Sequence, residues 1–320
     1  MPYLLKLIVA NTLRHKLRSV LTIIGLLVAI LAFGLLQTVV GAWYAGVDAA
    51  SASRLITRNA ISLIFPMPET YRDKIRRVEG VATVSYANWF GGIYQEPKNF
   101  FPKFAIDPDS YFMVYPEFVI KPDELAAFKR ERKAAVIGRK LAQEYGFKLG
   151  DIIPIKGDIY PGNWEFIVRA IYDGKDAKVD TSQLLFHWSY LNETVRRSVP
   201  RRANQVGIFL SQLKNPNDAA AVSVAIDETF KNSLAETLSE TEKAFQLGFV
   251  KQTEAIVIAI RIVSFVVIFI IMAVMVNTMA MTARERIAEY ATLKALGFGP
   301  GFVALLIFGE SIAICTLGAG

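Results

Sequence analysis

The chain divides into long stretches without charge and one long region in which apolar and polar residues are mixed. Two uncharged runs of 22 residues, Val20–Gly41 and Ile262–Ala283, flank the mixed region, and a third run, Phe302–Gly320, contains a single charge, Glu310. At about 1.5 Å rise per residue, 22 residues are long enough to cross a hydrocarbon core of about 30 Å. We therefore expect a multi-pass membrane protein with transmembrane helices at 19–41 (TM1), 251–283 (a stalk followed by TM2) and 300–320 (the start of TM3).

Basic residues beside these runs set the expected orientation. Lys6, Arg14, Lys16 and Arg18 precede the first run, and the first acidic residue of the chain is Asp48. Because Lys and Arg are retained on the cytoplasmic side, the N-terminus is predicted to be cytoplasmic and residues 42–250 to lie outside. The loop at 284–299 then returns to the cytoplasm, where its own basic residues fit the same rule.

The N-terminal segment has two further interpretations. Apolar residues followed by basic ones at 1–18 are typical of an amphipathic helix in the cytoplasmic interface, or of simple topogenic anchoring. A secretory signal peptide is the competing interpretation of the first run, but the run is too long for a signal core and no A-x-A-like site follows it. We therefore interpret it as a membrane anchor.

The mixed region has the pattern of an α+β domain. Runs typical of strands, such as Ala60–Phe65, Val81–Trp89 and Phe100–Ile106, alternate with helical patterns such as Glu69–Val78. A second unit, at about 107–200, interrupts this pattern and predicts an insertion, so that one subdomain is built from both flanks and another from the middle. From about Glu240 a helical pattern continues into the second run and predicts a rigid stalk.

Composition excludes several classes of protein. With 53% hydrophobic and 20% charged residues the chain cannot be disordered, and a single cysteine excludes a disulfide scaffold. The net charge of +7 is modest, and we expect no nucleic-acid partner. We find no phosphate-binding loop, no metal-site spacing of His or Cys, and no nucleophile motif, so we assign no catalytic residue and no metal ligand.

Three charged groups are candidate sites. The acid pairs Asp107/Asp109 and Asp123/Glu124 adjoin prolines and are interpreted as solvated turns rather than an acid/base dyad. Four arginines at 196–202 are either a solvated face or a contact for acidic lipid headgroups or a partner. They are Arg196, Arg197, Arg201 and Arg202.

The most informative segment follows the second uncharged run. It reads Asn277-Thr-Met-Ala-Met-Thr-Ala-Arg-Glu-Arg-Ile-Ala-Glu-Tyr-Ala-Thr-Leu-Lys-Ala-Leu-Gly297 and predicts a short surface helix that Gly297 ends. This segment resembles the cytoplasmic coupling-helix signature of MacB/FtsX-like ABC transporter permeases. Leu17–Gly25 is similar to the entry to the first span of that family, and Gly138–Asp151 to its extracytoplasmic domain.

The resemblance implies a fold and a set of partners. The fold is a set of α-helical transmembrane segments plus an α+β extracytoplasmic domain with a porter-like part and a sabre-like insertion at about 107–200. The partners are a cytoplasmic ABC ATPase, a second permease in a homo- or heterodimer, the lipid membrane, and a periplasmic adaptor or lipoprotein carrier. No cofactor binds the chain itself, since ATP and Mg²⁺ bind the ATPase, and the location is the bacterial inner membrane with the large domain in the periplasm.

The resemblance also assigns residues. The ATPase-coupling helix and its end comprise Arg284, Glu285, Arg286, Glu289, Lys294, Leu296 and Gly297. Glu310 and Asn277 are polar residues within predicted spans, where an acid facing lipid is costly. Because the family has four spans and TM4 is absent here, we expect the sequence to be a piece of a longer protein.

Three functions fit these features. The chain is expected to be a permease subunit that couples ATP hydrolysis to extracytoplasmic movement, called mechanotransmission, and exports amphipathic or lipid-linked cargo. An FtsX-like regulator of an extracytoplasmic hydrolase is the alternative. A two-span sensor fits less well, since a signalling helix bundle would follow its second span.

Overall fold

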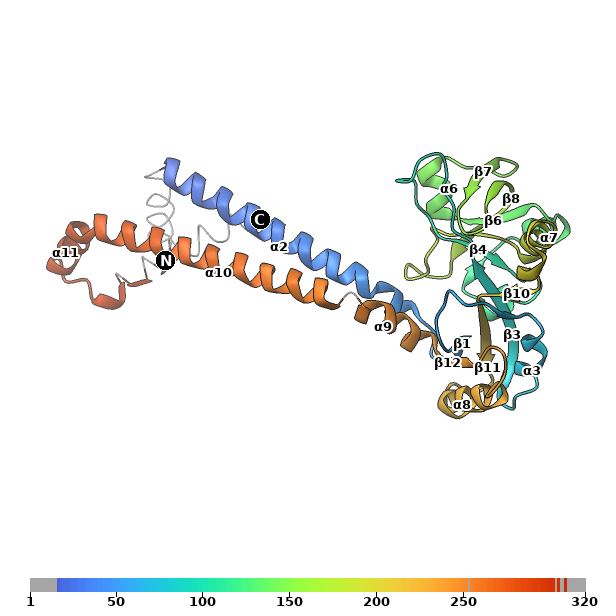
Figure 1. Cartoon of the computed structure of the whole chain (residues 1–320). Coiled ribbons are helices and arrows are strands. Elements are labelled where there is room, and N and C mark those ends of the chain that lie inside the picture. The colour runs from blue at the N-terminus through green and yellow to red at the C-terminus, as the bar shows by residue number, and fades with distance from the viewer. Residues whose placement is uncertain (1–15, 253, 303, 306–307, 310–320) are drawn as a thin grey trace. The chain divides into compact units, whose positions relative to one another are not determined.

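The computed structural model describes residues 16–252, 254–302, 304–305 and 308–309, which form two compact units. The described residues within 1–43 and 250–320 form one unit, and residues 44–249 form the other, called here the α/β domain (Figure 1).

The first unit contains two long apolar helices. Helix α2 covers Lys16–Ala49 and continues into the α/β domain, and α10 covers Glu254–Glu285. Each contains a window long and apolar enough to cross a membrane, Ile23–Gly41 and Ala255–Val274. Few side chains of these windows are buried, which is expected of surfaces that contact lipid.

Several expectations for this unit change or fall outside the described residues. Lys16–Arg18 belong to α2 rather than to a separate interfacial helix, and residues 1–15 are not described. The apolar window of α10 begins at Ala255 and includes Arg261, so it begins before the predicted run. Most of the predicted third span, including Glu310, lies outside the described residues.

The α/β domain is built on one mixed sheet. Its ten strands, all within the fully described range 44–249, have the order β12-β1-β11-β3-β4-β9-β6-β8-β5, and β7 pairs with β8. The strands are β1 Arg54–Asn59, β3 Val81–Trp89, β4 Lys103–Ile106, β5 Phe118–Val119, β6 Ala134–Gly138, β7 Ile152–Gly157, β8 Gly162–Gly174, β9 Leu184–His187, β11 Ile208–Leu213 and β12 Thr237–Thr241. Only β4–β9 and β6–β8 pair in parallel, and a separate two-stranded ribbon joins β2 (Met67–Pro68) to β10 (Gln205–Val206).

Short helices connect and cover these strands. They are α3 Tyr71–Ile75, α4 Tyr111–Val114, α5 Pro122–Arg130, α6 Arg139–Tyr145, α7 Trp188–Ser198, α8 Ala219–Thr229 and α9 Glu242–Gln252, with 3₁₀ turns η1 Pro200–Arg202 and η2 Pro216–Asp218. The middle of the chain supplies β5–β9, the two flanks supply β1, β3, β11 and β12, and β4 joins the halves. Whether these halves are the porter-like and sabre-like parts stays a prediction.

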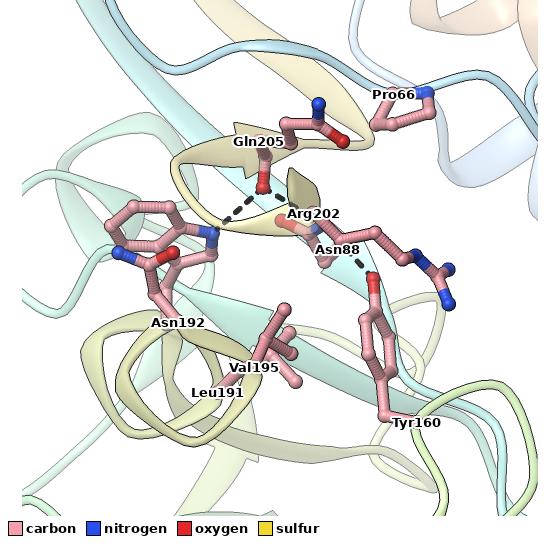
Figure 2. Close-up of a pocket in the computed structure, with 9 residues that line it drawn as sticks. Pro66, Asn88, Tyr160, Leu191, Asn192, Val195, Arg202 and Gln205 are labelled. Atoms are coloured by element: carbon pink, nitrogen blue, oxygen red, sulfur yellow. Dashed lines mark hydrogen bonds between the residues drawn. The ribbon is translucent and has the colours of Figure 1, made fainter. Parts of the chain in front are cut away.

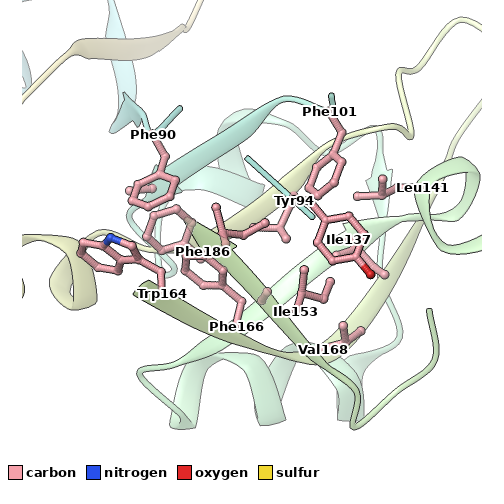
Figure 3. Close-up of a cluster of buried hydrophobic side chains, with 14 of the residues drawn as sticks. Phe90, Tyr94, Phe101, Ile137, Leu141, Ile153, Trp164, Phe166, Val168 and Phe186 are labelled. Atoms are coloured by element: carbon pink, nitrogen blue, oxygen red, sulfur yellow. The ribbon is translucent and has the colours of Figure 1, made fainter. Parts of the chain in front are cut away.

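The sheet packs apolar clusters on its faces. Aromatic side chains, among them Phe90, Phe166 and Phe186, fill the cluster in the half built from the middle of the chain (Figure 3). In β8 a bulge at Arg169 shifts the alternation, so that Val168 faces this cluster while Ala170 faces another. A single strand therefore contributes to two cores because one extra residue reverses its faces.

Three local predictions are corrected by the structure. Ala60–Phe65 is a loop with turns, not a strand, because Asn59 and Ser62 side chains accept the backbone N–H groups of Ile61 and Ile64. Glu240 lies in β12, so the helical pattern expected from there begins at Glu242, the first residue of α9.

Helix α8 also starts differently from the prediction. The sequence predicts a helix that begins at Asn217 and is capped by Asn217 or Asp218, but the 3₁₀ turn η2 precedes α8. The Asn215 side chain accepts the N–H of Asn217, and Asp218 makes no side-chain capping bond. The strand predicted over Val81–Trp89 has those bounds in the structure.

Candidate functional site

The predicted ATPase-coupling segment forms a sharp corner between two helices. Helix α10 ends at Glu285, Arg286 leaves helical geometry with φ −108° and ψ 13°, and α11 covers Ile287–Ala295. The N–H of Arg286 donates to Ala283 O (3.3 Å), and its own carbonyl accepts the N–H of Tyr290 (3.0 Å). Arg286 therefore closes one helix and opens the next.

The side chain of Arg286 holds this corner together. It is only 7% exposed, its Nε donates to Glu289 Oε2 at 3.0 Å, and its guanidinium carbon lies 6.0 Å from the centroid of the Tyr290 ring. Glu289 lies in the first turn of α11, where a carboxylate also stabilises the helix N-terminus. Arg286, predicted as part of the ATPase-coupling helix, is buried and placed to shape the corner.

The end of α11 explains the Leu-Lys-Ala-Leu-Gly motif. Gly297 has φ +90°, its N–H donates to Lys294 O (3.0 Å), and the N–H of Phe298 donates to Leu293 O (3.1 Å). These two bonds define a Schellman cap, whose left-handed position favours glycine. Gly297 thus fixes where α11 stops.

The structure locates the remaining predicted residues of this segment. Exposed residues are Arg284, Glu285, Glu289, Lys294 and Leu296, and Asn277 is exposed on α10. The apolar side chains of Ile287 and Leu296 are also exposed at the two ends of α11. The segment can therefore present both charge and apolar surface to a partner, although its contact with an ATPase stays a prediction.

A second group, which the sequence did not single out, lies in the α/β domain. Arg54 is 3% exposed, and its guanidinium donates to both oxygens of Glu242 (3.1 and 3.0 Å) and to Glu117 Oε1 (2.7 Å). It also stacks on the Tyr115 ring, with 3.7 Å between the guanidinium carbon and the ring centroid. Tyr115 and the N–H of Ser51 donate to Glu242 at 3.0 and 2.8 Å.

This group, called here the Arg54 network, connects three parts of the chain. Ser51 and Arg54 follow the end of α2, Glu242 is the first residue of α9, and Glu117 and Tyr115 belong to the middle of the chain. Burial, together with neighbouring Tyr111 and Glu242, raises the pKa of Tyr115 well above its ordinary value, which keeps its hydroxyl a donor. The sequence shows the members of this network only as isolated charges. Arg54 and Glu242 are 188 positions apart, so their contact leaves no local pattern.

One acid of each pair, and His187, have structural roles. Asp107 is buried and accepts from Ser110 Oγ at 2.5 Å, and Glu124 is buried and accepts the N–H of Ile171 at 3.0 Å, so the prediction of a solvated position is wrong for these two acids. Asp109 and Asp123 are exposed, as predicted. His187 Nε2 lies 2.7 Å from Phe128 O, and burial lowers the pKa of its imidazole. Among the described residues no group of three His, Cys, Asp or Glu side chains could hold a metal ion.

A small pocket lies beside the arginine-rich segment (Figure 2). Asn88, Tyr160 and Gln205 meet there, with Asn88 Nδ2 donating to Tyr160 Oη and Gln205 O, both at 3.4 Å. Leu191 and Val195 of α7 form its apolar wall, and Arg202 lies at its edge.

Comparison with known families decides the identity of the chain. The model of the MacB-like periplasmic core domain matches residues 19–229, and that of the FtsX-like permease C-terminal matches residues 261–320. The chain belongs to the MacB/FtsX-like family of ABC transporter permeases. No curated protein matches it in sequence.

Solved structures similar to this MacB/FtsX-like permease are distant in sequence. The periplasmic region of MacB from Actinobacillus actinomycetemcomitans is 10% identical with a TM-score of 0.45, and the match covers 63% of this chain and 95% of that one. The extracellular domain of the noncanonic ABC-type transporter YknZ from Gram-positive bacteria is 13% identical (TM-score 0.39; 59% and 100% covered). A domain of a putative permease from Porphyromonas gingivalis is 10% identical (TM-score 0.40; 60% and 92% covered).

Membership of the MacB/FtsX-like permeases establishes several general properties. The chain is a membrane protein with a periplasmic domain, it is an ABC transporter permease subunit, and it functions with a cytoplasmic ABC ATPase. Permeases of this family are generally non-catalytic. The corner at Arg286 and helix α11 fall within the match to the FtsX-like C-terminal, and the Arg54 network begins within the match to the MacB-like core.

Proposed function

We propose that this permease transmits ATP-driven movement from a cytoplasmic ATPase to the periplasmic α/β domain and thereby exports amphipathic or lipid-linked cargo. ATP and Mg²⁺ bind the ATPase, two permeases form the membrane part, and a periplasmic adaptor or lipoprotein receives the cargo. The permease lies in the bacterial inner membrane, with its N-terminus in the cytoplasm.

The Arg54 network is the observation that carries this proposal. Both connections between the α/β domain and the apolar helices meet in it, because Ser51 and Glu242 are bonded directly and Arg54 bonds Glu242 and Glu117. A displacement of α2 or α9 is therefore passed to the half of the sheet that carries Glu117. Buried charge networks whose hydrogen bonds are satisfied fix one relative arrangement of the segments that they join.

The apolar helices support the same mechanism. Ile23–Gly41 contains no charge and one amide, Gln37, and Ala255–Val274 contains one charge, Arg261. A polar pathway through a membrane needs ionisable or polar residues along it. The described helices offer little of this, so the proposal places cargo handling in the periplasm. The size of the α/β domain, which spans residues 44–249, favours transport over the FtsX-like regulator.

The test measures movement at the base of the α/β domain. Lys251, exposed on α9, is replaced by cysteine in a Cys315→Ser background, and crosslinking between two permeases in the ATPase complex is measured in nanodiscs with and without ATP. We expect at least a threefold ATP-dependent change. Cysteine at Lys178, an exposed loop residue, controls for random collision. Unchanged crosslinking at 251, with an ATP-dependent opening between α2 and α10, would replace mechanotransmission by alternating access.

A further inference from the structure

Four arginines gather without acidic partners at the end of α7 and in η1. Arg196, Arg197, Arg201 and Arg202 are all exposed, and within the described residues none of them forms a salt bridge. Arg196 Nη2 donates to Asn204 Oδ1 at 2.7 Å, a neutral acceptor. The acid of this stretch, Glu193, is bonded to Arg132 instead. Positive charge therefore accumulates here uncompensated, unlike that of Arg58, Arg139 and Arg169, each of which forms a salt bridge.

Arg202 lies where two small pockets adjoin. The first is the pocket of Figure 2, the second is lined by Pro161, Trp164 and Val199, and both contain Tyr160, Val195 and Arg202. The Arg202 guanidinium carbon lies 5.5 Å from the centroid of the Tyr160 ring, which orients the cation. Each pocket has a volume of about 20 Å³. They can seat single chemical groups of a ligand whose remainder lies on the surface.

An apolar loop adjoins the first pocket. Residues 60–66 follow β1, and Pro66 at the end of this loop lines the pocket together with Arg202. Ile61, Ile64 and Phe65 are 81%, 87% and 50% exposed. Isolated exposed apolar residues are ordinary, but three within five positions next to a cationic pocket form a patch of mixed character.

We propose that this surface, formed by residues 60–66, Tyr160–Trp164 and 195–202, binds an amphipathic anion in the periplasm. The acidic group of the ligand binds Arg202 with the neighbouring arginines, and its apolar part lies on Val199, Pro161 and the 60–66 loop. Guanidinium groups suit carboxylates and phosphates because their donors form a planar fork. The inference deepens the proposed function, on which it rests, by assigning negative charge to the cargo and a place where it binds.

The chain connections disfavour the bilayer surface as the occupant. Strand β1 begins near Arg54, four residues after α2, and pairs antiparallel with β12, which leads into α9. Both membrane connections therefore leave from the Arg54/Thr241 end of this strand pair. The 60–66 loop leaves from the opposite end, where Asn59 pairs with Thr237. A ligand released from the membrane fits this position better than headgroups within the membrane.

Photo-crosslinking tests the site in the intact permease–ATPase complex. A diazirine-bearing long-chain fatty acid is the probe, its primary amide is the uncharged control, and labelled peptides are mapped by mass spectrometry in neutral-lipid nanodiscs. We expect the acid to label segments 59–66 and 195–202 at least fivefold more than the amide. The Arg201→Gln/Arg202→Gln variant should lose this difference, while the Arg76→Gln/Arg77→Gln variant, an exposed pair outside the site, should keep it.

The other outcomes are equally defined. Equal labelling by acid and amide, or labelling that survives Arg201→Gln/Arg202→Gln, overturns the proposal. Competition by inorganic phosphate as strong as by unlabelled fatty acid shows a plain anion site and overturns the amphipathic part, and labelling that depends on anionic lipid in the nanodisc assigns the patch to the bilayer. Crosslinking at residue 251 is unaffected by these results, so failure here and failure of mechanotransmission are separable.

Discussion

Lys103 is a cation that the fold buries beside carbonyl groups rather than a carboxylate. It is 1% exposed, its Nζ donates to Phe101 O (2.9 Å) and Gly92 O (3.1 Å), and it lies 4.0 Å from the centroid of the Phe101 ring. Burial lowers the pKa of its ammonium from 10.5 to about 8, and the negative charge of Asp158 only partly opposes this shift. Lys103 thus fixes the backbone at Gly92 and Phe101. Burying its charged form lowers the stability of the folded state.

This burial predicts a pH dependence of stability with a definite sign. Because the folded state releases the Lys103 proton near pH 8 and the unfolded state near 10.5, the unfolded state binds more protons between these values, and stability rises with pH. The contribution is about 1.5 kcal/mol between about pH 8 and 9.5. As the pH rises from about 8 to 9.5, the melting temperature of wild type should therefore rise relative to that of Lys103→Met. If the two melting temperatures change in parallel with pH, the assignment to Lys103 is contradicted.

Exposed charges of the coupling segment, at the end of α10 and on α11, are predicted to bind the ATPase. Replacing Glu285, Glu289 and Lys294 by neutral isosteres should reduce co-purification of the ATPase at least fivefold, because these side chains lie on the surface of the coupling segment. Glu228→Gln, an exposed acid of the α/β domain, is the control. Full retention of the ATPase by the triple variant would leave α11 as a membrane-surface connector.

At the scale of elements, the cap of α11 offers a sharper test. Gly297 has φ +90° with nothing within 4 Å of an added Cβ, so Gly297→Ala brings strain without a clash, about 1 kcal/mol. Gly299 has equal space and no left-handed φ, which makes Gly299→Ala a matched control. We expect the first substitution, and not the second, to lower ATPase activity of the complex. Equal effects of both would show that helix termination is unimportant.

Sequence patterns predicted those secondary-structure elements that are determined by neighbouring residues. The strand at Val81–Trp89 and the glycine that ends α11 follow from alternation and from the need for a left-handed residue. The need for glycine at position 138 cannot be predicted from the local sequence. A Cβ there would lie 2.0 Å from Thr181 O, which is 43 positions away along the chain. Ala60–Phe65 has strand-like composition but no sheet neighbour, so side-chain bonds from Asn59 and Ser62 prevail.

The candidate sites divide in the same way. The coupling helix was predictable because its charges, length and terminal glycine are contiguous. The Arg54 network was not, because Arg54, Glu117 and Glu242 are distributed over the chain and each alone resembles a surface charge. Arg286 shows a third case, in which the position was predicted but the burial, and hence the role, came only from the packing of Tyr290 and Glu289 around it.

For the whole molecule, the Arg54 network predicts that stability and coupling are lost together. Arg54→Met leaves Glu117 and Glu242 without their cation in a buried site, which typically costs 3–5 kcal/mol. Arg54→Lys keeps the charge but loses the guanidinium whose Nη1 bonds Glu242 while Nη2 bonds Glu117. Glu242→Gln in the Arg54→Met background removes one of the two carboxylates left without a cation. The expected order of melting temperature is wild type, Arg54→Lys, the double variant, then Arg54→Met.

Coupling distinguishes a transmission role from a purely structural one. Arg54→Lys, which retains most of the fold, should abolish the ATP-dependent change in crosslinking at residue 251 while ATPase binding persists, because α11, the proposed ATPase contact, is untouched. Arg139→Gln, which removes an exposed pair with Asp173, should change neither stability by more than about 1 kcal/mol nor crosslinking. If Arg54→Lys lowers the melting temperature and leaves the ATP-dependent change intact, the network only stabilises the domain, and movement reaches the sheet by another route.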